Sequence, residues 1–352
     1  MTRTEGMAWG VAVLAGLGVL GGLVWRPHAV YGPWLAACAA WLGWPLGSMA
    51  LILVHALTGG RWGEILRPAL RAGVATLPLG VPALAILLAG AGDLYPWLHA
   101  GDVAWNANRF YLNAPFALAR IAVYAVVWGG LGALCLRGRG LARIAPAGLI
   151  LLALTFSFAA IDLTESLDPR FSSSAYGLIA SAGAGLLALA LGLLLALLEG
   201  GPRPDREAMR DLARLLLGLT VVWAYLDFMQ FLIVWQSNLP IEAAWYGRRL
   251  HGGWGAVAAG IVLLHFLLPF VLLMLAPLQT KRPVILGAAG VLVVMEIMRN
   301  LWLVLPGRAS VSVMLTGASL LVFAAAGVAL GIRSMVRAGM APGDMTPGGA
   351  HA

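Results

Sequence analysis

Carboxylates interrupt the apolar sequence most closely in the stretch IDLTESLDPR, which begins at Ile161. Asp162 and Glu165 are three residues apart there, and residues with this spacing share one face of a helix. Two neighbouring carboxylates at low dielectric cannot both ionise easily, so one should take up a proton near neutral pH. The pair therefore suits a proton relay, although a solvated helix end would carry the same residues.

A second polar stretch runs from Tyr225 to Leu250. Asp227 and Gln230 share a face by the same spacing, and Gln236 and Glu242 follow them. Helix packing alone does not need carboxylate and amide groups at these positions. We interpret the stretch as a functional polar path.

Four further ionisable residues lie inside apolar segments, where charge is costly and often functional. Arg120 needs a carboxylate or backbone carbonyls as its partner. Glu296 and Arg299 are three residues apart, so an internal ion pair is the alternative to a functional role. His265 can carry protons or serve as a hydrogen-bonding group in packing.

The sequence contains few residues that could bind a metal ion. Its two cysteines, Cys38 and Cys135, form no CxxC motif and no Cys/His cluster, so iron–sulfur and structural zinc sites are unsupported. His55 and His265 differ in depth by roughly nine residues, or about 14 Å, so they should not share a haem. We expect no catalytic residues and no bound redox metal.

Long apolar stretches must position these groups. Of 352 residues, 61% are hydrophobic and 11% are charged, against roughly 25% charged in soluble domains. Stretches of about 20 apolar residues without strand-like alternation predict transmembrane helices. We expect an all-α integral membrane protein with spans at about 7–25, 33–58, 68–91, 112–136, 143–162, 175–198, 212–236, 253–276, 283–304 and 308–336.

The basic residues predict an orientation. One set of connections carries 15 of the 23 Lys and Arg residues, and the other set carries six. The positive-inside rule then places both termini in the cytoplasm of a multi-pass protein. We expect one membrane domain over 1–337 and a flexible cytoplasmic tail over 338–352. The net charge of +8 reflects this topology and anionic lipid, and nucleic acid is not expected as a partner.

Several motifs in order resemble a known family, over about residues 30–306. They are TGGRWGEILRPALRAGVATLPLG from Thr58, YPWLH from Tyr95, YLNAPFALAR from Tyr111, IDLTESLDPRFSSSAYG from Ile161, the segment 227–249 and MRNLWLVLP from Met298. Together they resemble the polysulfide-reductase-like (NrfD-like) membrane subunits, in particular the second quinone-binding subunit of alternative complex III, a quinol:cytochrome c oxidoreductase.

The resemblance implies a fold of two four-helix bundles, roughly 33–162 and 175–304, with flanking helices. It implies a respiratory complex in the bacterial cytoplasmic (inner) membrane, with a multihaem cytochrome, an iron–sulfur subunit and a second NrfD-like subunit as partners. This subunit would hold no metal, could contact quinol or menaquinol, and would move protons through its polar residues.

Two other functions remain open. A secondary transporter tends to have broken helices at matching positions of two repeats, and the sequence shows no convincing pair. A structural membrane anchor of another oxidoreductase would use its polar groups only to hold helices together, through contacts averaging near 0.6 kcal/mol.

Overall fold

The computed structural model describes residues 2–99, 109–198, 204–308 and 311–337, and within these ranges the chain forms helices and no strands. The predicted tail 338–352 lies outside the described residues. The helices are α1 (Arg3–Trp25), α2 (Pro27–Thr58), α3 (Arg61–Val74), α4 (Gly80–Ala89), α5 (Ala91–Leu94), α6 (Ala114–Arg137), α7 (Leu141–Leu163), α8 (Tyr176–Leu198), α9 (Arg206–Ser237), α10 (Pro240–Leu250), α11 (Gly253–Gly260), α12 (Leu268–Met274), α13 (Arg282–Val304) and α14 (Val313–Arg337).

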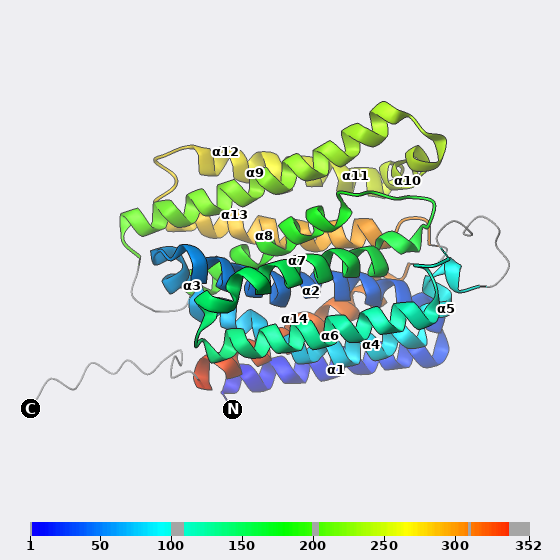
Figure 1. The fold of residues 1–352 in the computed structure, drawn as a ribbon, viewed down its shortest axis with the longest axis horizontal. Helices are drawn as coiled ribbons and strands as arrows, with labels where there is room; N and C mark the ends of the chain where they lie inside the picture. Colours follow the sequence, from blue (N-terminus) through cyan, green and yellow to red (C-terminus); the bar gives the residue numbers. More distant parts are fainter. Residues whose placement is uncertain (1, 100–108, 199–203, 309–310, 338–352) are drawn as a thin grey trace, which may run out of the picture.

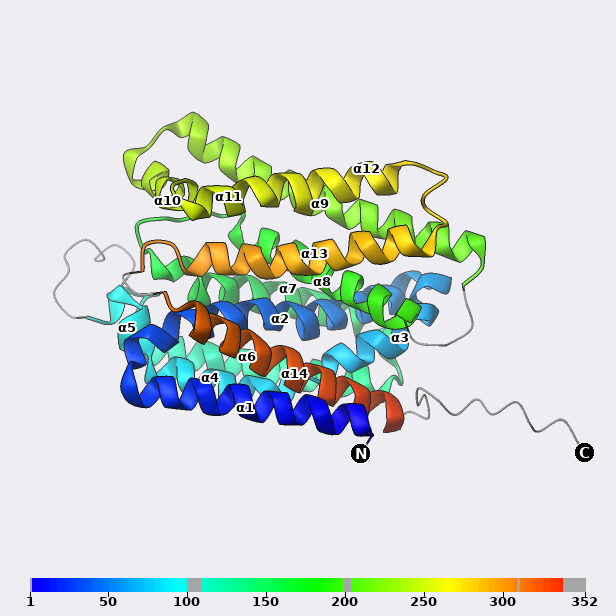
Figure 2. The same ribbon diagram turned by 180° about the vertical axis from the view of Figure 1, so that it is seen from behind.

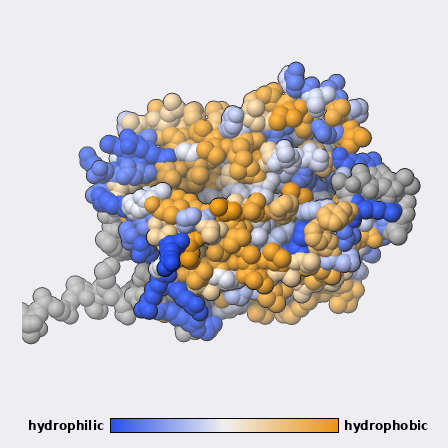
Figure 3. All heavy atoms as spheres, viewed as in Figure 1, coloured by the Kyte–Doolittle hydropathy of each residue, from blue (hydrophilic) through white to orange (hydrophobic). Residues whose placement is uncertain are grey.

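Ten helical segments of the described chain are long and apolar enough to cross a membrane, as the sequence predicts. On the face drawn in Figure 3, apolar residues cover most of the middle of the molecule, and hydrophilic residues gather towards its two ends. In lipid every backbone polar group must bond within its own segment, which a helix achieves. The chain is thus an all-α, multi-pass membrane protein.

The spans form two groups of four around a central pair of helices. In the first group α2 packs with α3, α6 and α7. In the second group α8 packs with α9 and α13, and both of these pack with the α11–α12 span. Helices α2 and α8 contact each other and join the groups, while α1 and α14 pair along one side (Figures 1 and 2). This arrangement agrees with two four-helix bundles and flanking helices.

The start of the first span and the end of the last span lie on the same side of the molecule. Arg3 and Arg337 mark this terminal end, and α5 and α10 lie at the opposite end, which we call the α10 end (Figure 1). The connection between α7 and α8 also lies at the α10 end, where the Asp168 carboxylate accepts a hydrogen bond from Arg248 of α10. An even number of spans requires both termini on one side, as observed.

Helix boundaries depart from the hydropathy prediction at prolines and at charged ends. The third span begins at Arg61 and is divided by a 3-10 turn, Leu77–Leu79, that contains Pro78. The second span begins at Pro27, because proline suits the first turn of a helix. The seventh begins at Arg206, since Asp205 caps it through the backbone N–H of Ala208. Helical hydrogen bonding therefore continues past the apolar core.

The central pair of helices depends on close backbone contact. A Cβ at Gly47 of α2 would lie 2.0 Å from the carbonyl oxygen of Ala184 in α8. Small residues at such crossings let membrane helices approach closely. Gly47 thus sets the distance between the two bundles.

We expect Gly47→Ala to destabilise the protein by about 1–3 kcal/mol, because the new methyl group forces α2 and α8 apart. The measurement is the Tm of the detergent-purified protein. Gly218→Ala is the matched control, since a Cβ on this exposed glycine of α9 meets nothing within 4 Å. Equal Tm values for the two variants would show that the crossing tolerates the methyl group.

Candidate functional site

A buried ionic cluster lies between α9 and α13 in the second bundle. The Arg299 Nη2 donates to Asp227 Oδ1 at 2.9 Å, and Nη1 lies 3.8 Å from Glu296 Oε1. The Arg299 and Glu296 side chains are only 6% and 5% exposed, whereas the Asp227 side chain is 32% exposed. The predicted Glu296–Arg299 pair is present, but the direct hydrogen bond of Arg299 goes to another helix. Arg299 therefore ties α13 to α9.

His265 brings the eighth span into this cluster. Its Nε2 lies 3.6 Å from Glu296 Oε2, and its ring is 4.0 Å from that of Trp223 on α9. The histidine lies in a π-helical segment, Ile261–Leu267, between α11 and α12. Insertions of this kind often occur at functional sites because they redirect a side chain. The segment places a fully buried imidazole against the carboxyl group.

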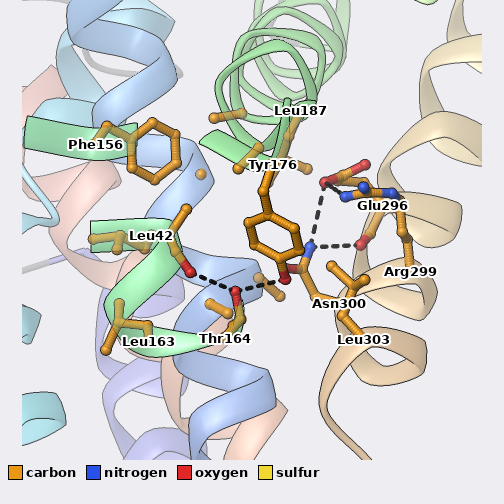
Figure 4. A pocket seen from close by; sticks show the side chains of 16 residues that line it. Leu42, Phe156, Leu163, Thr164, Tyr176, Leu187, Glu296, Arg299, Asn300 and Leu303 are labelled. Carbon is orange, nitrogen blue, oxygen red and sulfur yellow. Dashed lines mark hydrogen bonds and ion pairs between the residues drawn. The ribbon is translucent and has the colours of Figure 1, made fainter. Parts of the chain in front are cut away.

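A small cavity adjoins the cluster. Its volume is about 50 Å³, and Thr164, Tyr176, Glu296, Arg299 and Asn300 supply polar groups to its wall. The Asn300 amide donates to Glu296 Oε1 at 3.3 Å, and the Tyr176 hydroxyl donates to Thr164 Oγ1 at 2.8 Å (Figure 4). Apolar residues of α2, α7 and α8, with Leu303 of α13, complete the lining. The cavity thus separates the ionic cluster from a hydroxyl pair nearer the α10 end.

Polar groups continue from the second bundle to the α10 end. The Glu165 carboxylate accepts a hydrogen bond from the backbone N–H of Ser173, whose hydroxyl donates to Gln230 Oε1 at 2.8 Å. The Gln230 amide in turn lies 3.3 Å from the Tyr246 hydroxyl of α10. Glu165 and Gln230 are each 5% exposed. These hydrogen bonds connect α9 with α10 and with the segment between α7 and α8.

The first bundle has a separate ion pair near the α10 end. Arg120 of α6 donates to both carboxylate oxygens of Asp162 at 2.8 and 2.9 Å, and the Tyr124 hydroxyl donates to the same carboxylate at 2.7 Å. Arg120 also donates to the carbonyl of Tyr111 and stacks over that ring at 3.8 Å. The arginine has both kinds of partner that the sequence predicted.

Asp162 and Glu165 do not act as a pair in this structure. Helix α7 ends at Leu163, and a 3-10 turn carries Glu165, so the two residues do not share a helix face. Asp162 is bound to α6, whereas Glu165 accepts its hydrogen bond from Ser173. The prediction that the two carboxylates share one helix face is therefore wrong.

Helix α10 covers the second bundle with an arginine buried among aromatic rings. The Arg249 guanidinium lies 3.6 Å from the Trp245 ring and donates to the carbonyls of Trp245 and Leu303. Burial lowers the pKa of Arg249 to about 10. Arg249 also accepts a hydrogen bond from Trp302 through its own carbonyl, so α10 is fixed to the end of α13.

Two predicted residues lie apart from these groups. Gln236 is exposed in the last turn of α9, and Glu242 is half-buried in the first turn of α10. Neither makes a hydrogen bond or ion pair with the cluster among the described residues. Of the four residues predicted as site candidates in 225–250, only Asp227 and Gln230 contact the polar groups described above.

The structure adds functional candidates that the sequence reasoning did not select. Tyr124 lies four residues after Arg120, Trp223 lies four before Asp227, and Asn300 directly follows Arg299. Helical residues four apart lie on one face, so this spacing could have identified Tyr124 and Trp223. Tyr176 had no such signal, because it begins a different helix and reaches Thr164 through the tertiary fold.

The described residues contain no group of three or more His, Cys, Asp or Glu side chains that could hold a metal ion. His265 is paired with Glu296, and His55 contacts Gly60 and Trp62 near the terminal end. The two histidines thus belong to different sites.

The fold and the site define a multi-pass α-helical membrane protein with a buried cluster of ionisable residues. Comparison with protein-family models gives no match to this chain, and comparison with curated protein sequences gives none either.

We expect Arg120→Met to destabilise the protein by about 3–5 kcal/mol, because Asp162 would be left as a buried charge without its cation. The double variant Arg120→Met/Asp162→Leu should recover much of the loss, since it removes both charges. Thermal unfolding in detergent gives the three Tm values. A double variant that is less stable than Arg120→Met would contradict this account.

Proposed function

We propose that this chain is a proton-carrying membrane subunit of a bacterial quinol:acceptor oxidoreductase of the alternative complex III type. The single observation behind the proposal is the cluster of buried His265, Glu296 and Arg299 with half-buried Asp227, beside a cavity. Such groups inside a membrane are costly and mark ion or proton pathways. The motifs that resemble NrfD-like subunits supply the class of complex.

Glu296 is the group best suited to bind and release a proton. It is buried, and its Oε2 has no hydrogen-bond partner among the described residues, although His265 Nε2 lies 3.6 Å away. A cavity of about 50 Å³ has room for a water molecule, whose share of liquid volume is about 30 Å³. Water there would connect Glu296 with the Tyr176 hydroxyl and the α10 end.

The depth of the cluster favours coupling to a reaction at the α10 end. Glu296 lies eight residues before Val304, where α13 ends, which is about 12 Å at 1.5 Å per residue. Quinol oxidation releases electrons and protons together. Metal centres of partner subunits would take the electrons, while this chain would supply titratable groups for the protons and part of the quinol-site environment.

The first bundle contains a natural comparison for this site. Thr155 is the fifteenth residue of α7 (141 to 155), and Glu296 is the fifteenth residue of α13 (282 to 296). In the first bundle, Thr155 accepts a hydrogen bond from Trp128 of α6 at 3.0 Å. In the second bundle, Glu296 faces His265 of the α11–α12 span, which corresponds to α6. The two bundles thus hold a neutral pair and an ionisable pair at similar positions.

We expect Glu296→Gln to lower quinol oxidation and coupled proton transfer by roughly 100-fold, the scale of losing an acid–base group. The protein would be tagged, purified from its native membranes with its partners, and reconstituted in liposomes. Quinol oxidation with cytochrome c and the pH change would be followed together.

Thr155→Val is the matched control, because it removes the equivalent neutral contact in the first bundle. It should leave both rates within about twofold, and bound haem content should be equal in all preparations. Wild-type rates in Glu296→Gln would reject the proton role. Purification without quinol oxidation, together with solute uptake by the chain alone, would instead support a transporter.

We also propose that both termini face the cytoplasm of the inner membrane, since arginines are concentrated at the terminal end. In Ser172→Cys the new thiol would lie at the α10 end, and in Glu207→Cys it would lie at the terminal end; both positions are exposed. A membrane-impermeant maleimide should label only the first variant in spheroplasts. The native Cys38 and Cys135 are buried and supply little background. The opposite labelling pattern would reverse the orientation.

A further inference from the structure

A groove at the terminal end combines arginines with an apolar wall. It lies between α3, the turn after it, the end of α6 and the end of α14, and its volume is about 500 Å³. Arg71, Arg333 and Arg337 line it, together with Ala75, Pro78, Leu136 and Leu330 among others. This volume is within the range of ligand sites in proteins, about 300–1,000 Å³.

The charge in this groove is not neutralised by the protein. The lining contains no carboxylate, and within the described part of the chain Arg333 and Arg337 make no ion pair. Arg71 donates to the backbone carbonyl of Leu136, which leaves its charge uncompensated. Glu5 of α1 lines an adjoining cavity with Arg333 and Arg337. Three positive charges against one negative charge still leave the groove cationic.

In a bilayer that covers the apolar spans, the groove would lie at the depth of the lipid head groups. Arg71 lies level with the last turn of α6, because it donates a hydrogen bond to the carbonyl of Leu136. Arg333 and Arg337 occupy the last two turns of α14. Both helices have apolar spans that lead from this end into the bilayer (Figures 1 and 2). The arginines are therefore next to the surface where phosphate groups are concentrated.

We propose that the groove binds an anionic phospholipid. Its phosphate oxygens accept hydrogen bonds from the guanidinium groups of Arg333 and Arg337, and Arg71 adds a third positive charge. One acyl chain lies along Ala75, Pro78 and Leu330. Basic pockets between transmembrane helices bind such head groups, and arginine suits phosphate because its donors form a fork. The apolar wall favours a lipid over a free anion.

The test measures lipid binding by the purified protein and does not depend on its activity. Delipidated protein would be titrated with cardiolipin, phosphatidylglycerol, phosphatidylcholine and inorganic phosphate, with Tm and native mass spectra as readouts. The anionic lipids should raise the Tm and remain bound in the spectra. Phosphatidylcholine and inorganic phosphate should have little effect.

Arg333→Gln/Arg337→Gln should weaken binding of the anionic lipids by about tenfold or more, given the attraction of each basic residue to such lipid. The matched control is Arg206→Gln/Arg210→Gln. These two arginines are also exposed and four residues apart, and they lie at the terminal end of the molecule, where α9 begins. It should bind like the wild type.

Three results would overturn the proposal. Equal weakening in both double variants would show general charge attraction and no site. Equal stabilisation by inorganic phosphate would show an anion site without lipid. Retention of phosphatidylcholine at the level of cardiolipin would show that the groove selects no charge.

Discussion

Hydrocarbon offers polar groups no partners, and this constraint organises the molecule. The backbone meets it by forming helices, and the charged side chains meet it by pairing across them. Arg299 shows the principle, because one guanidinium group holds Asp227 on α9 and faces Glu296 on its own helix. Arg120 does the same for α6 and α7 through Asp162. Each ion pair thus also specifies which helices pack together.

Hydropathy is sufficient to predict the ten spans. Polar residues are costly in lipid, so each span is a stretch of mostly apolar residues that can be recognised without knowing the tertiary fold. The partners of the buried charges were harder to predict. Glu296 and Arg299 could be paired from their spacing, whereas Asp227 and Asp162 meet arginines 72 and 42 residues away. Such contacts depend on which helices become neighbours. Local spacing was misleading for Glu165, since it cannot reveal that α7 ends two residues earlier.

The two bundles have similar helix order but different chemistry. In the first, the ion pair lies near the α10 end, and deeper contacts such as Trp128 with Thr155 are neutral. In the second, the ionisable groups lie deeper, and a π-helical segment directs His265 towards Glu296. Gly183 of α8 leaves room for this carboxylate, because a Cβ there would lie 2.6 Å from Glu296 Oε1. The second bundle therefore accommodates a buried acid that helix packing would not require.

Along α13, the surroundings of Glu296 differ between the two ends of the helix. Towards the α10 end, Asn300, Tyr176 and Thr164 surround the cavity. Towards the terminal end, the buried side chains of α13 are apolar, namely Ile285, Ala288, Ala289, Leu292 and Met295. Ser48 and the Trp44 indole are buried polar groups further along α2, but they lie against Gly73 of α3, on another side of that helix. In this conformation, a proton on Glu296 would have as polar neighbours the groups of the cavity on the α10 side and the buried His265 imidazole, 3.6 Å from Oε2. If Glu296 carries a proton as proposed, transfer along α13 towards the terminal end would need a second conformation, in which these apolar contacts separate and admit water.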